Sequence, residues 1–146
     1  MSLPEFNSKG DLPPGVHQAN MNEVLAKFGG SFPARQAVTA SLVRIHNLAE
    51  ATGNLTKLVI FGSYVTEKSE PNDVDLVLVM ADDFKWHEQT GETRDLFDHQ
   101  RAAQEFGASI FWVRPSAILV GTLEEFIAHW QIKRDKTLRG IVEVIV

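Results

Sequence analysis

Two pairs of residues in the stretch 57–80, KLVIFGSYVTEKSEPNDVDLVLVM, have the types and the spacing for metal and phosphate chemistry. Gly62 and Ser63 follow the first apolar run, and Asp73 and Asp75 lie two positions apart at the start of the second. Because side chains alternate along a strand, both carboxylates should project from one face, about 7 Å apart. They would repel each other unless a cation lay between them, and Mg²⁺ prefers oxygen ligands of this kind.

Gly62 and Ser63 provide the second half of the predicted site. Glycine lets the backbone come close to a bulky anion, and the N–H groups of a turn that opens a short helix can bind phosphate. A lone glycine-serine pair or a lone Asp-x-Asp pattern is usually structural. Here both occur together, separated by the nine residues 64–72. We therefore predict Asp73 and Asp75 as metal ligands beside a phosphate-binding turn.

The combined pattern resembles the signature of the nucleotidyltransferase superfamily typified by DNA polymerase β, in which Gly-Ser is followed several residues later by Asp-x-Asp. The resemblance covers roughly residues 33–114, and the small single-domain members, the minimal nucleotidyltransferases, have a similar length. The segments LPPGVH, GSYVTEK and PNDVDL are also similar to a group of uncharacterised bacterial proteins in this superfamily, which brings no established activity.

This resemblance implies a Mg²⁺-dependent or Mn²⁺-dependent transfer of a nucleoside monophosphate from an NTP to a protein or RNA hydroxyl, with pyrophosphate leaving. Asp73 and Asp75 would be the catalytic metal ligands. Gly62 and Ser63 would hold the β and γ phosphates of the nucleotide.

The sequence departs from the superfamily pattern at the third carboxylate, which active members carry on a later strand beside the aspartate pair. The corresponding strand, ASIFWVR, holds no acid, and Ser109 stands at the expected position. Three explanations stay open: catalysis is lost, Glu143 or Glu105 substitutes, or the third strand is aligned in the wrong register. The alternative function is a catalytically degenerate module that binds a nucleotide or a partner, as in a toxin–antitoxin pair. Whether the chain is an enzyme therefore stays open.

The elements that must position these residues follow from apolar periodicity and from glycine and proline. The predicted helices span 21–28, 33–51, 90–106 and a segment that starts at 122, and the predicted strands span 57–61, 74–80, 108–114 and 141–146. This alternation predicts an α/β or α+β domain with a small mixed sheet and helices packed on it, as the resemblance also implies. Residues 1–20 lack apolar periodicity, so we predict an extended N-terminal arm followed by a single domain, 21–146.

Composition narrows the class of protein. With 146 residues, of which 44% are hydrophobic, the chain is long enough for one core without disulfides. It has no cysteine, no apolar stretch of the ~20 residues that a membrane span needs, and no apolar core of a signal peptide at its N-terminus. We expect a cytoplasmic protein with no membrane association. The last segment, IVEVIV, is either an exposed edge or an internal strand, so both a monomer and a homodimer stay open.

Charge and aromatic residues add two expectations. The net charge is −5, yet the segment 131–140 holds four basic residues against one aspartate, a local balance of +3. It is either a solvated helix end or a patch that faces phosphate. Trp112 and Trp130 are expected in the core, whereas Trp86, in a polar loop, is the better candidate for a base or partner contact.

Overall fold

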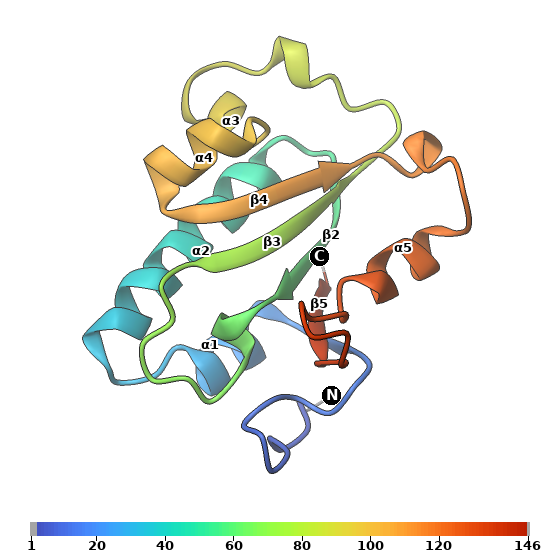
Figure 1. The fold of residues 1–146 in the computed structure, drawn as a ribbon. Coiled ribbons are helices and arrows are strands. Elements are labelled where there is room, and N and C mark those ends of the chain that lie inside the picture. The colour runs from blue at the N-terminus through green and yellow to red at the C-terminus, as the bar shows by residue number, and fades with distance from the viewer. Residues whose placement is uncertain (1–2, 146) are drawn as a thin grey trace.

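Five strands form one mixed sheet within residues 3–145, the part of the chain that the computed structural model describes (Figure 1). The strand order is β1-β5-β2-β3-β4. The pairs β1·β5 and β3·β4 are parallel, whereas β5·β2 and β2·β3 are antiparallel. This arrangement confirms the predicted α+β class with a small mixed sheet. The strands are β1 Val16–Ala19, β2 Leu55–Phe61, β3 Val74–Met80, β4 Ala108–Val113 and β5 Ile141–Ile145.

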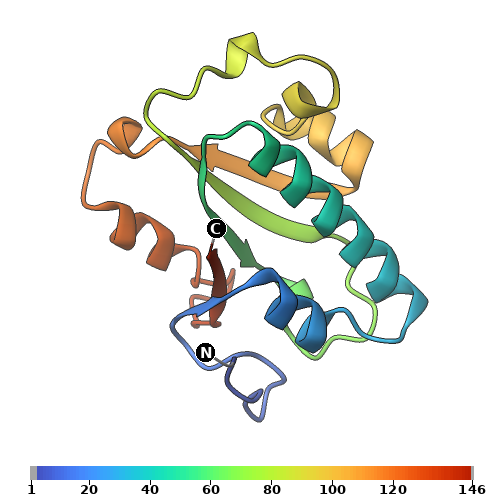
Figure 2. The ribbon, with the colours of Figure 1, turned by 180° about the vertical axis from the view of Figure 1, so that it is seen from behind.

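The helices cover the two faces of the sheet unequally (Figures 1 and 2). Helices α1, α2 and α4 lie on one face, where α2 crosses the sheet, and α5 lies on the other. The helices of residues 3–145 are α1 Met21–Phe28, α2 Pro33–Ala51, α3 Gly91–Asp95, α4 His99–Phe106 and α5 Leu123–His129. Single turns of 3-10 helix occur at Ser63–Val65, Trp86–Glu88 and Pro115–Ala117.

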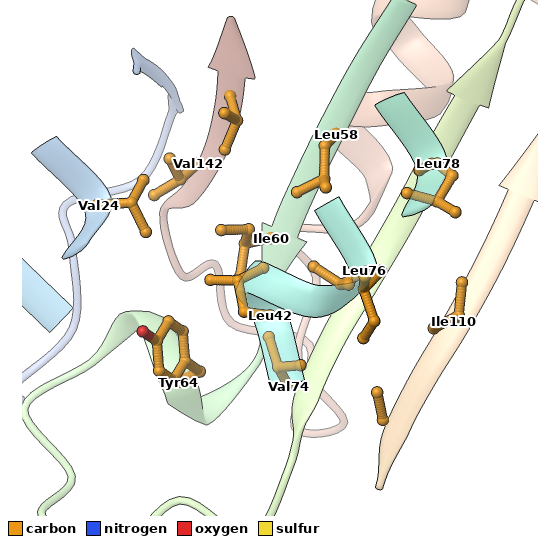
Figure 3. Packing of buried hydrophobic residues seen from close by; sticks show 14 of the residues in the cluster. Val24, Leu42, Leu58, Ile60, Tyr64, Val74, Leu76, Leu78, Ile110 and Val142 are labelled. Carbon is orange, nitrogen blue, oxygen red and sulfur yellow. The ribbon is translucent and has the colours of Figure 1, made fainter. Parts of the chain in front are cut away.

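The main hydrophobic core lies between the sheet and α2. Alternate residues of β2 and β3, among them Ile60 and Leu76, point toward Leu42 of α2 (Figure 3). The residues between them, Val59 and Val77, form a smaller cluster with α5 on the opposite face. Because the short α5 covers only part of that face, polar side chains at its margin reach solvent.

The predicted helix over 90–106 is wrong as one continuous helix, because it is divided into α3 and α4. Asp98 lies between the two, in an extended backbone conformation, and its side chain accepts a hydrogen bond from the Arg101 backbone N–H. An aspartate in this position caps a new helix, which explains the break. The strand bounds differ by small amounts: β2 starts at Leu55, two residues before the predicted start, and β4 ends at Val113.

The N-terminal segment differs from the predicted extended arm because part of it belongs to the sheet. Val16–Ala19 forms β1, which pairs with β5, and the side chain of Leu12 is fully buried. Strand β5 therefore lies between β1 and β2 and is internal. Residues 1–2 of the predicted arm and Val146 of the predicted last strand lie outside the described residues.

A buried arginine fixes the chain that follows the Gly62–Ser63 turn. Arg35, on α2, is 5% exposed, and its guanidinium donates hydrogen bonds to the carbonyl oxygens of Phe28, Tyr64, Thr66 and Lys68 at 2.5–3.0 Å. Burial lowers the pKa of Arg35, but the group stays charged because its ordinary value is so high. The helix α2 and the loop after β2 are thus held together by one side chain.

Among residues 3–145, no helix combines the length and the apolar character that a bilayer crossing requires.

Candidate functional site

The turn after β2 lies beside the start of β3 because the two strands are adjacent and antiparallel. Phe61, the last residue of β2, is the register partner of Asp75. Gly62 follows it directly, and its Cα lies against the Asp75 carboxylate. Ser63 then opens a single turn of 3-10 helix. The β2–β3 pairing thereby brings the glycine-serine pair and the aspartate pair to the same end of the sheet.

Gly62 occupies a backbone conformation that only glycine adopts without strain. Its φ is 78° and its ψ is −164°, a combination that is essentially restricted to glycine. A Cβ at this position would overlap the Oδ2 atom of Asp75. The sequence predicts that Gly62 makes room for a bound anion, and in the structure part of this room is taken by the Asp75 carboxylate.

Asp73 and Asp75 form a partly buried pair of carboxylates. Burial, together with the negative charge of Asp73, raises the pKa of Asp75 to about 6, while the neighbouring Ser109 hydroxyl and the positive charge of Arg139 lower it in part. Asp75 is therefore only half ionised near pH 6 when no cation is bound. Carboxylate oxygens that repel each other in this way are suitable ligands for a hard divalent cation, which would relieve the repulsion.

Ser109 stands directly beside the aspartate pair. It is the register partner of Asp75 on the parallel strand β4, and its Oγ lies 3.5 Å from Oδ2 of Asp73. The position predicted for the third acid is thus next to the pair, but the side chain there is a hydroxyl. Unlike an acid, it can hydrogen-bond to the carboxylates without adding charge.

Glu143 lies apart from the aspartate pair, on β5, with β2 between its strand and β3. It is 7% exposed, and both of its oxygens have partners. The Lys57 ammonium lies 3.0 Å from Oε1, and the Gln18 amide donates to Oε2 at 2.9 Å. This ion pair lines a separate pocket of about 680 Å³. The structure therefore gives Glu143 a role in holding β1, β5 and β2 together.

Glu105 also does not join the aspartates. It is exposed on α4, which packs against the opposite face of the sheet. Within the described residues, no group of three or more histidine, cysteine or acidic side chains is placed to hold a metal ion. Asp73 and Asp75 are thus a two-carboxylate set, which matches a Mg²⁺ ion that takes its other oxygens from substrate phosphates and water.

A pocket of about 600 Å³ opens over Asp75, Ser109 and Gly62. Its aromatic wall consists of Phe61, Phe111, Trp130 and His99. Its other wall, here called the basic wall, consists of residues 131–135 and Arg139, in which three cations stand against one acid, Asp135. One cavity therefore combines a carboxylate and hydroxyl floor with a cationic side and an apolar side. Segment 131–140 follows the end of α5 at His129, and most of its basic side chains line this pocket.

The basic wall is fixed by an acidic residue from the N-terminal segment. Asp11 is 5% exposed, its Oδ1 lies 3.1 Å from Nε of Arg139, and its Oδ2 lies 3.8 Å from Nζ of Lys133. Because one buried carboxylate contacts two cations, it fixes the loop at the rim of the pocket. The sequence offers no signal for Asp11, which stands in a segment without periodicity and far from its partners along the chain.

Ser63 faces a neighbouring pocket of about 530 Å³. Lys9, Lys68 and Arg139 line it as well, together with the acids Asp11 and Glu67, so its lining has a small excess of positive charge. Arg139 lines both pockets, the one over Asp75 and the one beside Ser63. Of the four residues predicted from the sequence, Gly62 and Asp75 line the first pocket and Ser63 lines the second, whereas Asp73 lines neither.

Comparison with known proteins assigns the chain to a family without assigning a function. A family of unknown function (DUF6932) matches residues 4–145, so the chain belongs to that family. No curated protein and no solved structure matches the chain.

The contact between Gly62 and Asp75 can be tested by substitution. Gly62→Ala should reduce the free energy of unfolding by about 3 kcal/mol, because it adds backbone strain and an overlap with the carboxylate. Gly53→Ala is the control: Gly53 also has a positive φ, of 75°, but an added Cβ would meet no atom within 4 Å. It should cost only about 1 kcal/mol.

Urea denaturation measures both values. Equal destabilisation of the two variants would show that the contact with Asp75 is not the reason for glycine at position 62. The same conclusion would follow if Gly62→Ala cost as much free energy of unfolding in an Asp75→Ala background as in the wild type.

The raised pKa of Asp75 predicts a pH-dependent stability. In the folded state this carboxyl binds its proton more tightly than its ordinary pKa of 3.8 allows, so its contribution to the free energy of unfolding falls as the pH rises from about 4 to about 6. In metal-free buffer, Asp75→Asn should therefore stabilise the protein above pH 6, by on the order of 1–2 kcal/mol after solvent screening. The gain should shrink on acidification and vanish below pH 3.8.

Urea denaturation across this pH range, with Asp83→Asn as the control, measures the effect. Asp83 is exposed in the loop after β3 and should give no such gain. A gain for Asp75→Asn that is constant with pH would show that the substitution acts through packing and not through the charge.

Proposed function

We propose that this protein binds an NTP together with Mg²⁺ or Mn²⁺ and transfers the nucleoside monophosphate to a hydroxyl group of a protein or an RNA. The observation that carries the proposal is the position of Asp75 beside Gly62 in a pocket with a basic wall. Ser63 and Asp73 stand next to these two residues in the chain. The resemblance of the same four residues to the nucleotidyltransferase signature supports this assignment.

The reaction divides the tasks among these residues. The acceptor oxygen forms a bond to the α phosphorus, the bond from this phosphorus to the β-phosphate oxygen breaks, and pyrophosphate leaves while the acceptor proton passes to water. Asp73 and Asp75 would hold the metal ion, which neutralises phosphate charge and polarises the phosphorus. The Gly62–Ser63 turn and Arg139 would hold the β and γ phosphates on the side of the second basic pocket.

Ser109 favours a second candidate function. A hydroxyl beside the pair is a poor metal ligand and cannot act as a general base near neutral pH, so the chemical step loses the help of a third carboxylate. The candidate is a degenerate module that keeps nucleotide and metal binding and acts through a partner, such as the toxin or antitoxin of a two-component system. The geometry of the two pockets supports binding equally in both cases.

The proposed substrates also indicate a location in the cell. NTPs and Mg²⁺ are abundant in the cytoplasm, and the absence of cysteine agrees with a reducing compartment. We therefore propose a cytoplasmic protein.

Labelling with nucleotides tests the activity directly. The protein is incubated with each α-labelled NTP, Mg²⁺ or Mn²⁺, and a lysate that provides acceptors. A transferred label is expected with at least one NTP, and Asp73→Asn or Asp75→Asn should remove it, whereas Asp83→Asn should not. Ser109→Asp should raise the rate, because it places an acid at the register partner of Asp75.

The outcomes separate the two candidates. If no NTP labels any acceptor but calorimetry detects Mg²⁺-dependent NTP binding that needs Asp75, the degenerate module is favoured and the transferase is rejected. If neither binding nor transfer occurs, both candidates are wrong.

A further inference from the structure

Four rings line the pocket over Asp75: Phe61 from β2, Phe111 from β4, His99 from the start of α4 and Trp130 from the end of α5. The ring centroids of Phe61 and Trp130 lie 4.7 Å apart, and those of Phe111 and Trp130 lie 5.0 Å apart. The His99 ring lies 4.8 Å from the Phe111 ring and is tilted by 34°. These distances are in the range of favourable aromatic contacts, so the rings support each other as one wall.

Phe111 differs from most large apolar side chains of the sheet because it is 37% exposed. It lies on the pocket face of β4, two residues after Ser109, which corresponds to about 7 Å along the strand. Its aromatic ring is therefore displaced from the carboxylates by a length comparable to that from the α phosphate to the base of a nucleotide. A planar group held there would contact Phe111 while its phosphate contacts the floor of the pocket.

The charges of the pocket select the class of ligand. Lys133, Arg134 and Arg139 line the same cavity as the aromatic wall, where Asp75 and Asp135 are the acids. Asp11 is ion-paired with Lys133 and Arg139, so Arg134 is the cation of this wall that has no acidic partner among the described residues, and it favours an anion over a purely apolar molecule. An aromatic surface next to a cationic one suits a ligand that is flat and apolar at one end and negatively charged at the other. A nucleotide has this combination. Ile132, which is 43% exposed, also lines this pocket, whereas the most exposed apolar residues, Leu119 and Val120, lie in a loop outside it.

We infer that the base of the bound nucleotide stacks on Phe111, with Trp130, Phe61 and His99 supporting that ring. This inference rests on the proposed function and adds the position and the mode of base recognition. Stacking contacts the face of the base and does not read its edges, so it tolerates every base and favours the larger purines. We therefore expect this pocket to accept several NTPs, with a preference for ATP and GTP. Trp86, which lies outside the pocket lining, has no part in this contact.

The test compares a ligand that has a base with one that lacks it. Calorimetry measures the binding of ATP and of inorganic tripolyphosphate, both with Mg²⁺, to the wild type and to variants. The wild type should bind ATP more tightly than tripolyphosphate. Phe111→Ala should weaken ATP binding by about 10-fold to 100-fold, the range found when a stacking aromatic is removed, and leave tripolyphosphate binding unchanged. Phe111→Tyr should retain the wild-type affinity for ATP.

Phe32→Ala is the matched control, since Phe32 is a more exposed phenylalanine, 54%, and does not line the pocket. The inference fails if the wild type binds ATP no more tightly than tripolyphosphate, or if Phe111→Ala weakens both ligands equally. The proposed function stands after either result, because phosphate binding remains. If the wild type binds neither ligand, the proposed function and this inference fail together.

Discussion

The candidate site depends on the register between β2 and β3. The pairing of Phe61 with Asp75 places the glycine-serine turn directly beside the two carboxylates, although nine residues separate these motifs in the sequence. A slip of one residue would move Asp75 to the face that packs on α2, where a carboxylate would be buried in the main hydrophobic core. The alternation of apolar residues along both strands prevents this slip. The packing of the hydrophobic core therefore also determines where the Asp75 carboxylate and the glycine-serine turn lie.

Two buried charged residues from distant parts of the chain hold the segments around this register. Arg35 binds four backbone carbonyls and so fixes the loop that leaves the glycine-serine turn. Asp11 contacts Arg139 and Lys133 and so fixes the basic rim of the pocket. The repulsion between Asp73 and Asp75, in contrast, is only partly relieved within the protein. A carboxyl group whose pKa is raised by burial and by a like charge, within a well-supported frame, is common at functional sites.

Sequence reasoning was most successful where a local pattern determines the structure. The apolar runs around 57–61 and 74–80 indicate β2 and β3, and the glycine and aspartate residues at their ends lie together in the structure. The position of Ser109 as the neighbour of the pair follows from the same strand pattern. Sequence reasoning failed where the contacts are distant in the chain. The four-residue strand β1 exists through its pairing with β5, and no periodicity of its own marks it.

Other residues of the site were missed for related reasons. Asp11 acquires its role only when residues 133 and 139 fold back onto it, which no local spacing indicates. Trp130 was expected in the core, and it is indeed partly buried with α5, but its ring also lines the pocket. An apolar residue at the margin of a core and an apolar residue that lines a pocket cannot be distinguished in the sequence, because both are on the side of their helix that faces the sheet. Phe111 is likewise exposed because α5 covers only part of the sheet face on which both lie.

The most direct measurement of the central claim is a crystal structure of the protein with Mn²⁺ and a non-hydrolysable NTP. We predict an anomalous peak within bonding distance of both Asp73 and Asp75, with the β and γ phosphates against Gly62 and Ser63. A metal ion bound elsewhere, or a nucleotide held only in the pocket of Lys57 and Glu143, would contradict the account.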